Sequence, residues 1–250
     1  MATSGRPLDP PALAGTVARA TVWLAVGVAV TQTAVGAANE LTVESSALNP
    51  DVEGSIFQLL SAAVTAAAAA AAAIHAWLVR ERRFRFVTLA AILAAFTADD
   101  LLAVHERGGD AVGGTLLGLP DHLAVRLWIV LLLPLLVVLF LILAGEAVRA
   151  AGRVGWVLGA GLAALVAAVG VELVGAISRS PSVVARIGGK PEAVRLLVEE
   201  GLEIGGLVLV AGGLWSLVAA VLPVRQSQAS SDGAAAHDVE PDPDPTVGGA

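Results

Sequence analysis

The feature that most constrains this chain is a series of apolar stretches, each about 20 residues long and nearly free of charge. A helix of that length crosses the roughly 30 Å hydrocarbon core of a bilayer. Because backbone groups find no water there, only helices and closed barrels span a membrane. The stretches are runs of Ala, Leu and Val without the period-2 alternation of barrel strands. The sequence therefore predicts an all-α integral membrane helical bundle, with the lipid bilayer as its surroundings.

The stretches form one membrane domain over residues 14–225, with about six transmembrane helices. Only 15% of the 250 residues are charged, against about 25% in soluble domains. The flanking segments, 1–13 and 226–250, are rich in Pro, Ser, Asp, Ala or Gly, so we expect both to be disordered, the second as an acidic tail. The six predicted spans are 20–38, 55–79, 86–106, 125–146, 155–177 and 200–222. The third of them is the least hydrophobic.

The distribution of Lys and Arg predicts the orientation of the bundle. The side that holds both termini carries nine of these residues and the opposite side six. The strongest contribution is the Arg80–Arg85 segment after the second span, whereas the charges of the loop before that span are all acidic. We therefore expect both termini in the cytoplasm, and a multi-pass protein of a bacterial inner (plasma) membrane.

Carboxylates and histidines gather at one depth of the predicted bundle, its outer third, although they are scattered along the sequence. An ionised side chain at the centre of a transmembrane helix costs about 2.5–3.5 kcal/mol, so these groups should face the bundle interior. Their mutual repulsion there requires protonation or a bound cation. The candidate site comprises Asp99, Asp100, His105, Glu106, His122, Glu172, Glu199, Glu200 and Glu203.

A structural interpretation competes with this functional one. Acids at helix ends, such as Glu106, Asp121, Glu199 and Glu200, are solvated by headgroup water. The acids that lie deeper in the membrane form either a functional site or an ion-pair network with Arg107 or Arg126. These deeper acids are Asp99, Asp100, Glu172 and Glu203. Polar residues of the first two spans either line one cavity together with these acids or form hydrogen bonds between helices. They are Thr31, Gln32, Thr33, Gln58 and Ser61. His75, at the other end of the second span, is expected to snorkel at the interface.

Two motifs in the cluster carry a resemblance. The stretch Asp99-Asp100-Leu-Leu-Ala-Val-His105-Glu106 and the later Glu199-Glu200-Gly-Leu-Glu203 resemble paired motifs of uncharacterised bacterial multi-pass membrane proteins. Those proteins carry an acidic pair followed by His-Glu, and a Glu-Glu-x-x-Glu entering the last span. The resemblance covers about spans three to six. It implies that the cluster is one unit, and it brings no established activity.

A carboxylate-rich site with histidines suits a divalent metal such as Mn, Fe, Zn or Ca, and the absence of cysteine excludes thiolate ligands. The Glu-x-x-His spacing of di-metal bundles is also absent. A metal with an open position would activate water to hydrolyse a lipid or another amphiphile. Asp99 or Glu203 would then be ligands, and His105 or His122 a ligand or general base. Cation or metal binding is therefore the leading functional prediction, with a metal-dependent membrane enzyme as one form of it.

Two other functions stay open at this point. Buried protonatable carboxylates also build proton or cation transport pathways, although the cytoplasmic half of these spans is almost purely apolar. In a structural or partner-binding membrane subunit, the acids would satisfy one another. Nucleotide and nucleic-acid binding are not expected, because the sequence has no Gly-rich phosphate loop and no basic patch interleaved with aromatic residues.

Overall fold

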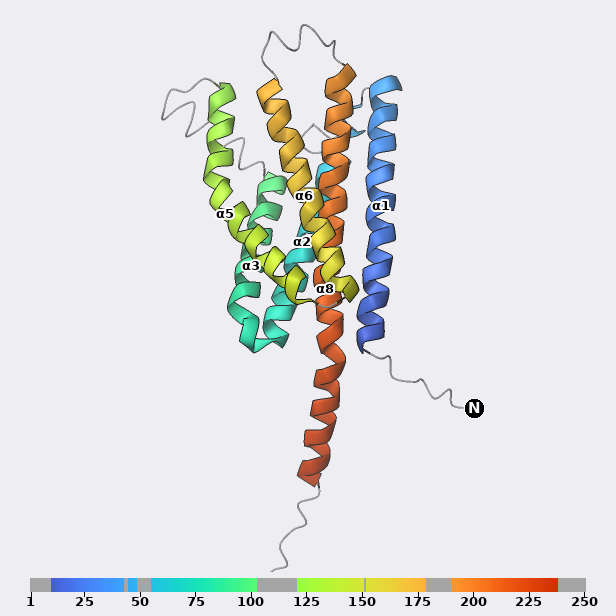
Figure 1. Cartoon of the computed structure of the whole chain (residues 1–250), viewed down its shortest axis with the longest axis vertical. Coiled ribbons are helices and arrows are strands. Elements are labelled where there is room, and N and C mark those ends of the chain that lie inside the picture. The colour runs from blue at the N-terminus through green and yellow to red at the C-terminus, as the bar shows by residue number, and fades with distance from the viewer. Residues whose placement is uncertain are drawn as a thin grey trace, which may run out of the picture.

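Ala and Leu, which favour helix most strongly, dominate the apolar stretches, and the structure is accordingly helical. The computed structural model describes residues 10–42, 45–48, 55–102, 121–150, 152–178 and 190–237. Within these residues it contains no strand, which confirms the all-α class. Two short 3-10 turns, η1 (Ser46–Leu48) and η2 (Arg80–Arg82), accompany six long helices: α1 (Pro10–Thr42), α2 (Ile56–Leu78), α3 (Arg83–Leu102), α5 (Asp121–Arg149), α6 (Gly152–Ser178) and α8 (Lys190–His237) (Figure 1).

Five of these helices are long and apolar enough to cross a membrane, which supports a membrane-embedded protein. Among the described residues, α3 is the long helix that does not meet this criterion. It begins with Arg83 and Arg85 and carries Asp99 and Asp100 in its last turn, so its charge-free stretch is short. The predicted crossing at 86–106 and the cytoplasmic position of both termini therefore stay predictions.

The central helix of the bundle is α8, which packs against α1, α2 and α6 (Figure 1). Within the 18-residue apolar stretch of its membrane-length segment, Leu197–Leu222, 61% of the residues are buried, compared with 17–33% in the corresponding stretches of the other four candidate spans. The remaining large contacts join chain neighbours, α2 with α3 and α5 with α6. Nearer the start of α8, residues 199–202 are half-buried and Glu203 is exposed.

Short turns fix the two hairpins around this helix. The Ser55 hydroxyl caps α2 by accepting a hydrogen bond of 3.2 Å from the Gln58 backbone N–H. At the other end of α2, the Val79 N–H donates to the His75 carbonyl at 2.8 Å, and η2 leads directly into α3. At the start of α6, Gly152 adopts a φ of +61°, the left-handed conformation that favours glycine.

The described helices extend beyond the predicted spans at both ends of the chain. α8 continues to His237 and so includes the first part of the segment that the sequence predicts to be a disordered tail. Once a helix has formed, each further residue except a proline such as Pro223 adds a hydrogen bond without a new nucleation cost, and alanines at 234–236 favour continuation. α1 likewise begins at Pro10, within the segment 1–13. Residues 1–9 and 238–250 lie outside the described part of the chain.

Glycines allow α6 and α8 to cross at close range. A Cβ atom placed on Gly161 would lie 2.9 Å from the Leu209 Cβ and the Val210 backbone nitrogen. A Cβ on Gly206, the facing residue of α8, would lie 2.9 Å from the Leu165 Cγ. Such distances leave no room for a methyl group, so the separation of these two helices depends on glycine at both positions.

Gly161→Ala should therefore destabilise the bundle by about 1–3 kcal/mol, because α6 and α8 would have to move apart. Gly159→Ala, on the same helix, is the matched control: its added methyl would meet nothing within 4 Å. Alanine favours helix over glycine, so this variant should be neutral or slightly stabilised. Thermal unfolding of both variants in detergent, followed by size-exclusion chromatography, measures the difference, and equal melting temperatures would contradict the close crossing.

Candidate functional site

The predicted acids of α3 and α8 lie at one end of the bundle, which we call the acidic end. Asp99 and Asp100 occupy the last turn of α3, and Glu199, Glu200 and Glu203 lie in the N-terminal part of α8. Both segments lie toward the upper side of the bundle in Figure 1. The offsets of three and four residues place Glu203 on the same helix face as the two preceding glutamates.

A polar cavity of about 110 Å³ lies between these acids and the first two helices. Asp100 lines it from α3, and Glu200 and Glu203 line it from α8. Gln32 of α1 and Gln58 and Ser61 of α2 complete its polar wall, so these residues share a cavity with the acids, one of the two arrangements predicted for them. Segments far apart in the sequence thus form a single polar chamber, called the polar cavity below.

Gln32 is the most deeply buried of these polar side chains, with 2% of its surface exposed. Its Nε2 donates a long hydrogen bond of 3.4 Å to Glu200 Oε2. Its Oε1 is also buried and has no hydrogen-bond partner among the residues that the structure describes. A buried acceptor without a partner costs about 1–3 kcal/mol, so a species that donates to this oxygen or coordinates it would be stabilised there.

Gln58 positions the end of α3 at this cavity. Its Nε2 donates a 2.8 Å hydrogen bond to the backbone carbonyl of Asp100. Carbonyls in the last turn of a helix lack an intrahelical N–H partner, and Gln58 supplies one here. Because the Gln58 backbone is itself held by the Ser55 cap, the first turn of α2 helps to fix where the backbone of Asp100 lies.

A second cavity, of about 230 Å³, adjoins the same acids and is called the apolar cavity below. Asp100, Glu199 and Glu203 line it at one end. The rest of its wall is mainly apolar and comes from five helices, with Leu93 and Phe96 from α3, Leu136 and Phe140 from α5, and further residues from α2, α6 and α8. Asp100 and Glu203 line both cavities and therefore stand at their junction.

Glu199 also takes part in a structural interaction. It forms an ion pair with Arg195, one turn earlier on α8, and both side chains are only 15% exposed. The partners that the sequence suggested for the deeper acids were Arg107 and Arg126. Arg107 lies outside the described residues, and the side chain of Arg126 lies outside the described part of α5. For Glu199, an arginine on its own helix provides the compensating charge.

The structure brings together part of the predicted set. Asp100, Glu199, Glu200 and Glu203 meet at the two cavities, whereas Asp99 is half-buried and lines neither. Within the described residues, no group of three or more His, Cys, Asp or Glu is arranged to hold a metal ion. The predicted divalent metal thus stays a prediction. The other candidates lie outside the described side chains: His105 and Glu106 entirely, and His122 and Glu172 as residues of α5 and α6.

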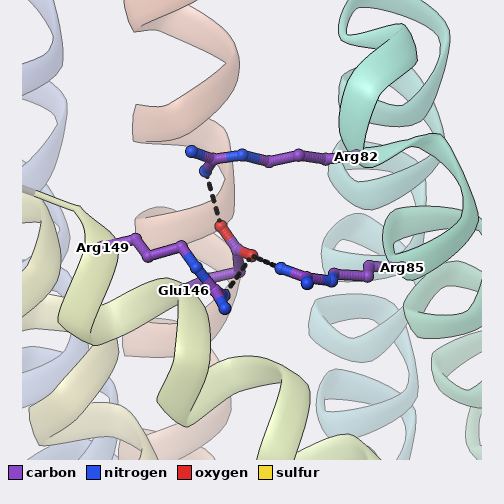
Figure 2. A network of polar contacts seen from close by, with 4 residues as sticks. All are labelled: Arg82, Arg85, Glu146 and Arg149. Atoms are coloured by element: carbon purple, nitrogen blue, oxygen red, sulfur yellow. Dashed lines mark hydrogen bonds and ion pairs between the residues drawn. The ribbon is translucent and has the colours of Figure 1, made fainter.

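The opposite end of the bundle, called the arginine end, holds an ion-pair network that sequence-based prediction missed (Figure 2). Glu146 of α5 is 1% exposed and accepts hydrogen bonds of 3.0 Å from Arg82 and from Arg149. Arg85 approaches the same carboxylate at 3.9 Å. The three arginine side chains are 42–51% exposed, so they reach water while the carboxylate does not. Three positive charges around one buried carboxylate account for its burial.

His75 lies near this network and is 4% exposed, so it is buried rather than snorkelling. Its ring stacks on Phe86 with 3.9 Å between the centroids. Its Nδ1 has no hydrogen-bond partner in the described part of the chain. The sequence predicts this half of the spans to be almost purely apolar apart from His75, and the buried Glu146 corrects that expectation. In the sequence, Glu146 and Arg149 look like an ordinary exposed pair three residues apart, which explains why the acid was overlooked.

The chain belongs to the family described as "Domain of unknown function (DUF8692)", whose model matches residues 12–217. The matched region begins in α1 and ends in α8, so it includes both polar clusters. No curated protein and no solved structure matches the chain. Membership of this family agrees with the predicted resemblance to uncharacterised proteins, and it assigns no activity.

Arg82→Ala should lower the free energy of unfolding by about 1–2 kcal/mol, because it removes a charge-assisted hydrogen bond to a buried carboxylate that retains Arg149. Arg83→Ala is the matched control, since Arg83 is the next residue, is exposed and lies outside the network. Thermal unfolding in detergent gives the comparison. An equal loss in both variants would show that positive charge in general, and not the contact with Glu146, stabilises this end.

Proposed function

We propose that this membrane protein binds a cation in the polar cavity, where Asp100, Glu200 and Glu203 supply negative charge. The observation that carries the proposal is the Oε1 atom of Gln32, a buried acceptor without a hydrogen-bond partner among the described residues. In this proposal the chain crosses a bacterial plasma membrane six times with both termini in the cytoplasm, so the acidic end faces away from the cytoplasm.

Electrostatics favours a cation over any other ligand class at this position. Three carboxylates around a cavity of about 110 Å³ repel one another, and the partial burial of Asp100 and Glu200 raises the cost of their charges, whereas Glu203 is exposed. A bound cation would offset both costs, and Gln32 Oε1 would add a neutral oxygen. Surroundings made of oxygen atoms suit a hard ion such as Ca²⁺ or Mn²⁺, or an ammonium group.

The metal-binding form of the proposal draws on residues beyond the described side chains. His105, Glu106, His122 and Glu172 would complete a shell for Mn, Fe, Zn or Ca around the acids of α3 and α8. A metal held there with an open coordination position would activate water for hydrolysis of a lipid or another amphiphile. The described oxygen groups by themselves support a cation without selecting a particular metal.

Proton or cation transport is the second candidate, and the buried groups of the arginine end favour it. Glu146 and His75 are titratable and buried in the half of the bundle opposite the polar cavity. Between the two ends lie fully buried apolar side chains, among them Leu89, Leu93 and Leu143. A transported ion would have to pass this layer, so binding is supported better than passage.

Asp100→Asn and Glu203→Gln test the proposal, because each keeps the size of the side chain and removes its charge. Each should weaken cation binding at least about tenfold, the loss of about 1.4 kcal/mol. Glu81→Gln, an exposed acid in η2 at the arginine end, is the control and should bind as the wild type does. Isothermal titration of detergent-purified protein with Na⁺, Ca²⁺, Mn²⁺, Zn²⁺ and methylammonium measures the affinities.

Gln32→Leu separates binding from stability in the same experiment. It removes the unpaired acceptor and only a long hydrogen bond, so the protein without ligand should be at least as stable as the wild type. Cation affinity should nevertheless fall. If the folded wild type bound none of the tested cations, the proposal would be wrong, and a structural or partner-binding role for the acids would be favoured.

A further inference from the structure

We infer that the cation is the protonated nitrogen of a small amphipathic amine, which lies among Asp100, Glu203 and Gln32 while its apolar body fills the apolar cavity. This inference rests on the proposed function and names the ligand class for the same site. Its basis is the position of two carboxylates at the junction of two cavities of opposite character.

An inorganic ion would use only half of this arrangement. Bound in the polar cavity, it would leave Asp100 and Glu203 also facing a mainly apolar space of about 230 Å³. Ionised carboxylates are poorly solvated beside apolar surface, so such a space is costly next to Asp100, which is half-buried, and less so next to Glu203, which is exposed. A molecule with a cationic end and an apolar end would match both surfaces at once.

The size of the apolar cavity limits the body of the ligand. Pockets for drug-sized molecules are about 300–1,000 Å³, and this cavity is smaller, at about 230 Å³. A short alkyl chain or a single ring fits this volume, whereas the two acyl chains of a membrane lipid do not. The wall that would contact the body includes Phe96, Leu136 and Phe140. The inference therefore commits to a free small amine and not to a lipid headgroup.

Gln32 adds a requirement on the nitrogen itself. Its Oε1 accepts hydrogen bonds and, in the described part of the chain, has no donor. A primary ammonium group carries three N–H donors, enough for this oxygen and for both carboxylates. A quaternary ammonium group has the same charge and no N–H, so it would leave the buried oxygen unsatisfied. Primary amines should therefore bind more tightly than quaternary ones of the same chain length.

Isothermal titration of the full-length protein in detergent tests the inference with four probes: hexylammonium, methylammonium, hexyltrimethylammonium and hexanol. Hexylammonium should bind at least about tenfold more tightly than methylammonium, since each fully buried methylene contributes about a factor of four. Hexyltrimethylammonium should bind at least tenfold more weakly than hexylammonium, and hexanol should show no saturable binding. Hexylammonium binding should fall at least tenfold in Asp100→Asn and persist in Glu81→Gln.

Two variants of the apolar cavity change its volume in opposite directions. Ala168→Leu, on α6, should fill it and reduce hexylammonium affinity at least tenfold while methylammonium binding is unchanged. Leu136→Ala, on α5, should enlarge it and shift the preferred chain from hexyl to octyl. The second variant keeps the test decisive if the first does not fold.

Three results would overturn the inference. Equal affinities for methylammonium and hexylammonium would show that the apolar cavity is not used, while leaving the proposed cation site intact. Hexylammonium binding that persists in Asp100→Asn would show partition into the micelle. An unchanged chain-length preference in both cavity variants would place the alkyl chain elsewhere. Absence of binding by every cation would instead be the failure of the proposed function.

Discussion

The burial of α8 is the constraint on which the rest of this structure depends. Its segment from Ile204 to Val218 is packed between α1, α2 and α6, with glycine at 206 where α6 comes closest. Because this segment has to be buried, Glu199 and Glu200 before it are half-buried, while Glu203 is exposed. Gln32 of α1 and Asp100 of α3 lie beside Glu200 and Glu203. Together they line a polar cavity whose acids come from both α3 and α8.

The carboxylates at the two ends of the bundle have different surroundings. At the arginine end, one carboxylate, Glu146, receives three half-exposed arginines and ties α5 to the α2–α3 hairpin. At the acidic end, several carboxylates line cavities, and Gln32 presents a buried oxygen without a partner among the described residues. The first arrangement is complete in itself and is best understood as structural. The second has room and chemistry for a ligand, and it is therefore the functional candidate.

The sequence predicted the parts of this structure that depend on hydropathy and depth. The all-α class and five of the six predicted apolar spans followed from hydropathy, and the shared depth of the acids is compatible with the cavity that Asp100, Glu200 and Glu203 line. Contacts between helices could not be predicted in the same way. Glu146 looks like a surface partner of Arg149 until α5 packs against the hairpin and buries it, and His75 looks interfacial until Phe86 covers its ring. The length of α8 was also missed, because hydropathy ends near residue 222 while the backbone hydrogen bonds continue.

Native mass spectrometry shows directly whether the acidic end holds a cation. Detergent-purified wild type and the Asp100→Asn/Glu203→Gln double variant would be measured after incubation with Mn²⁺, Ca²⁺ or hexylammonium, with elemental analysis of the same samples for the metals. We expect one saturable adduct on the wild type that is lost from the folded double variant. The same adducts on both proteins, or none on either, would contradict it.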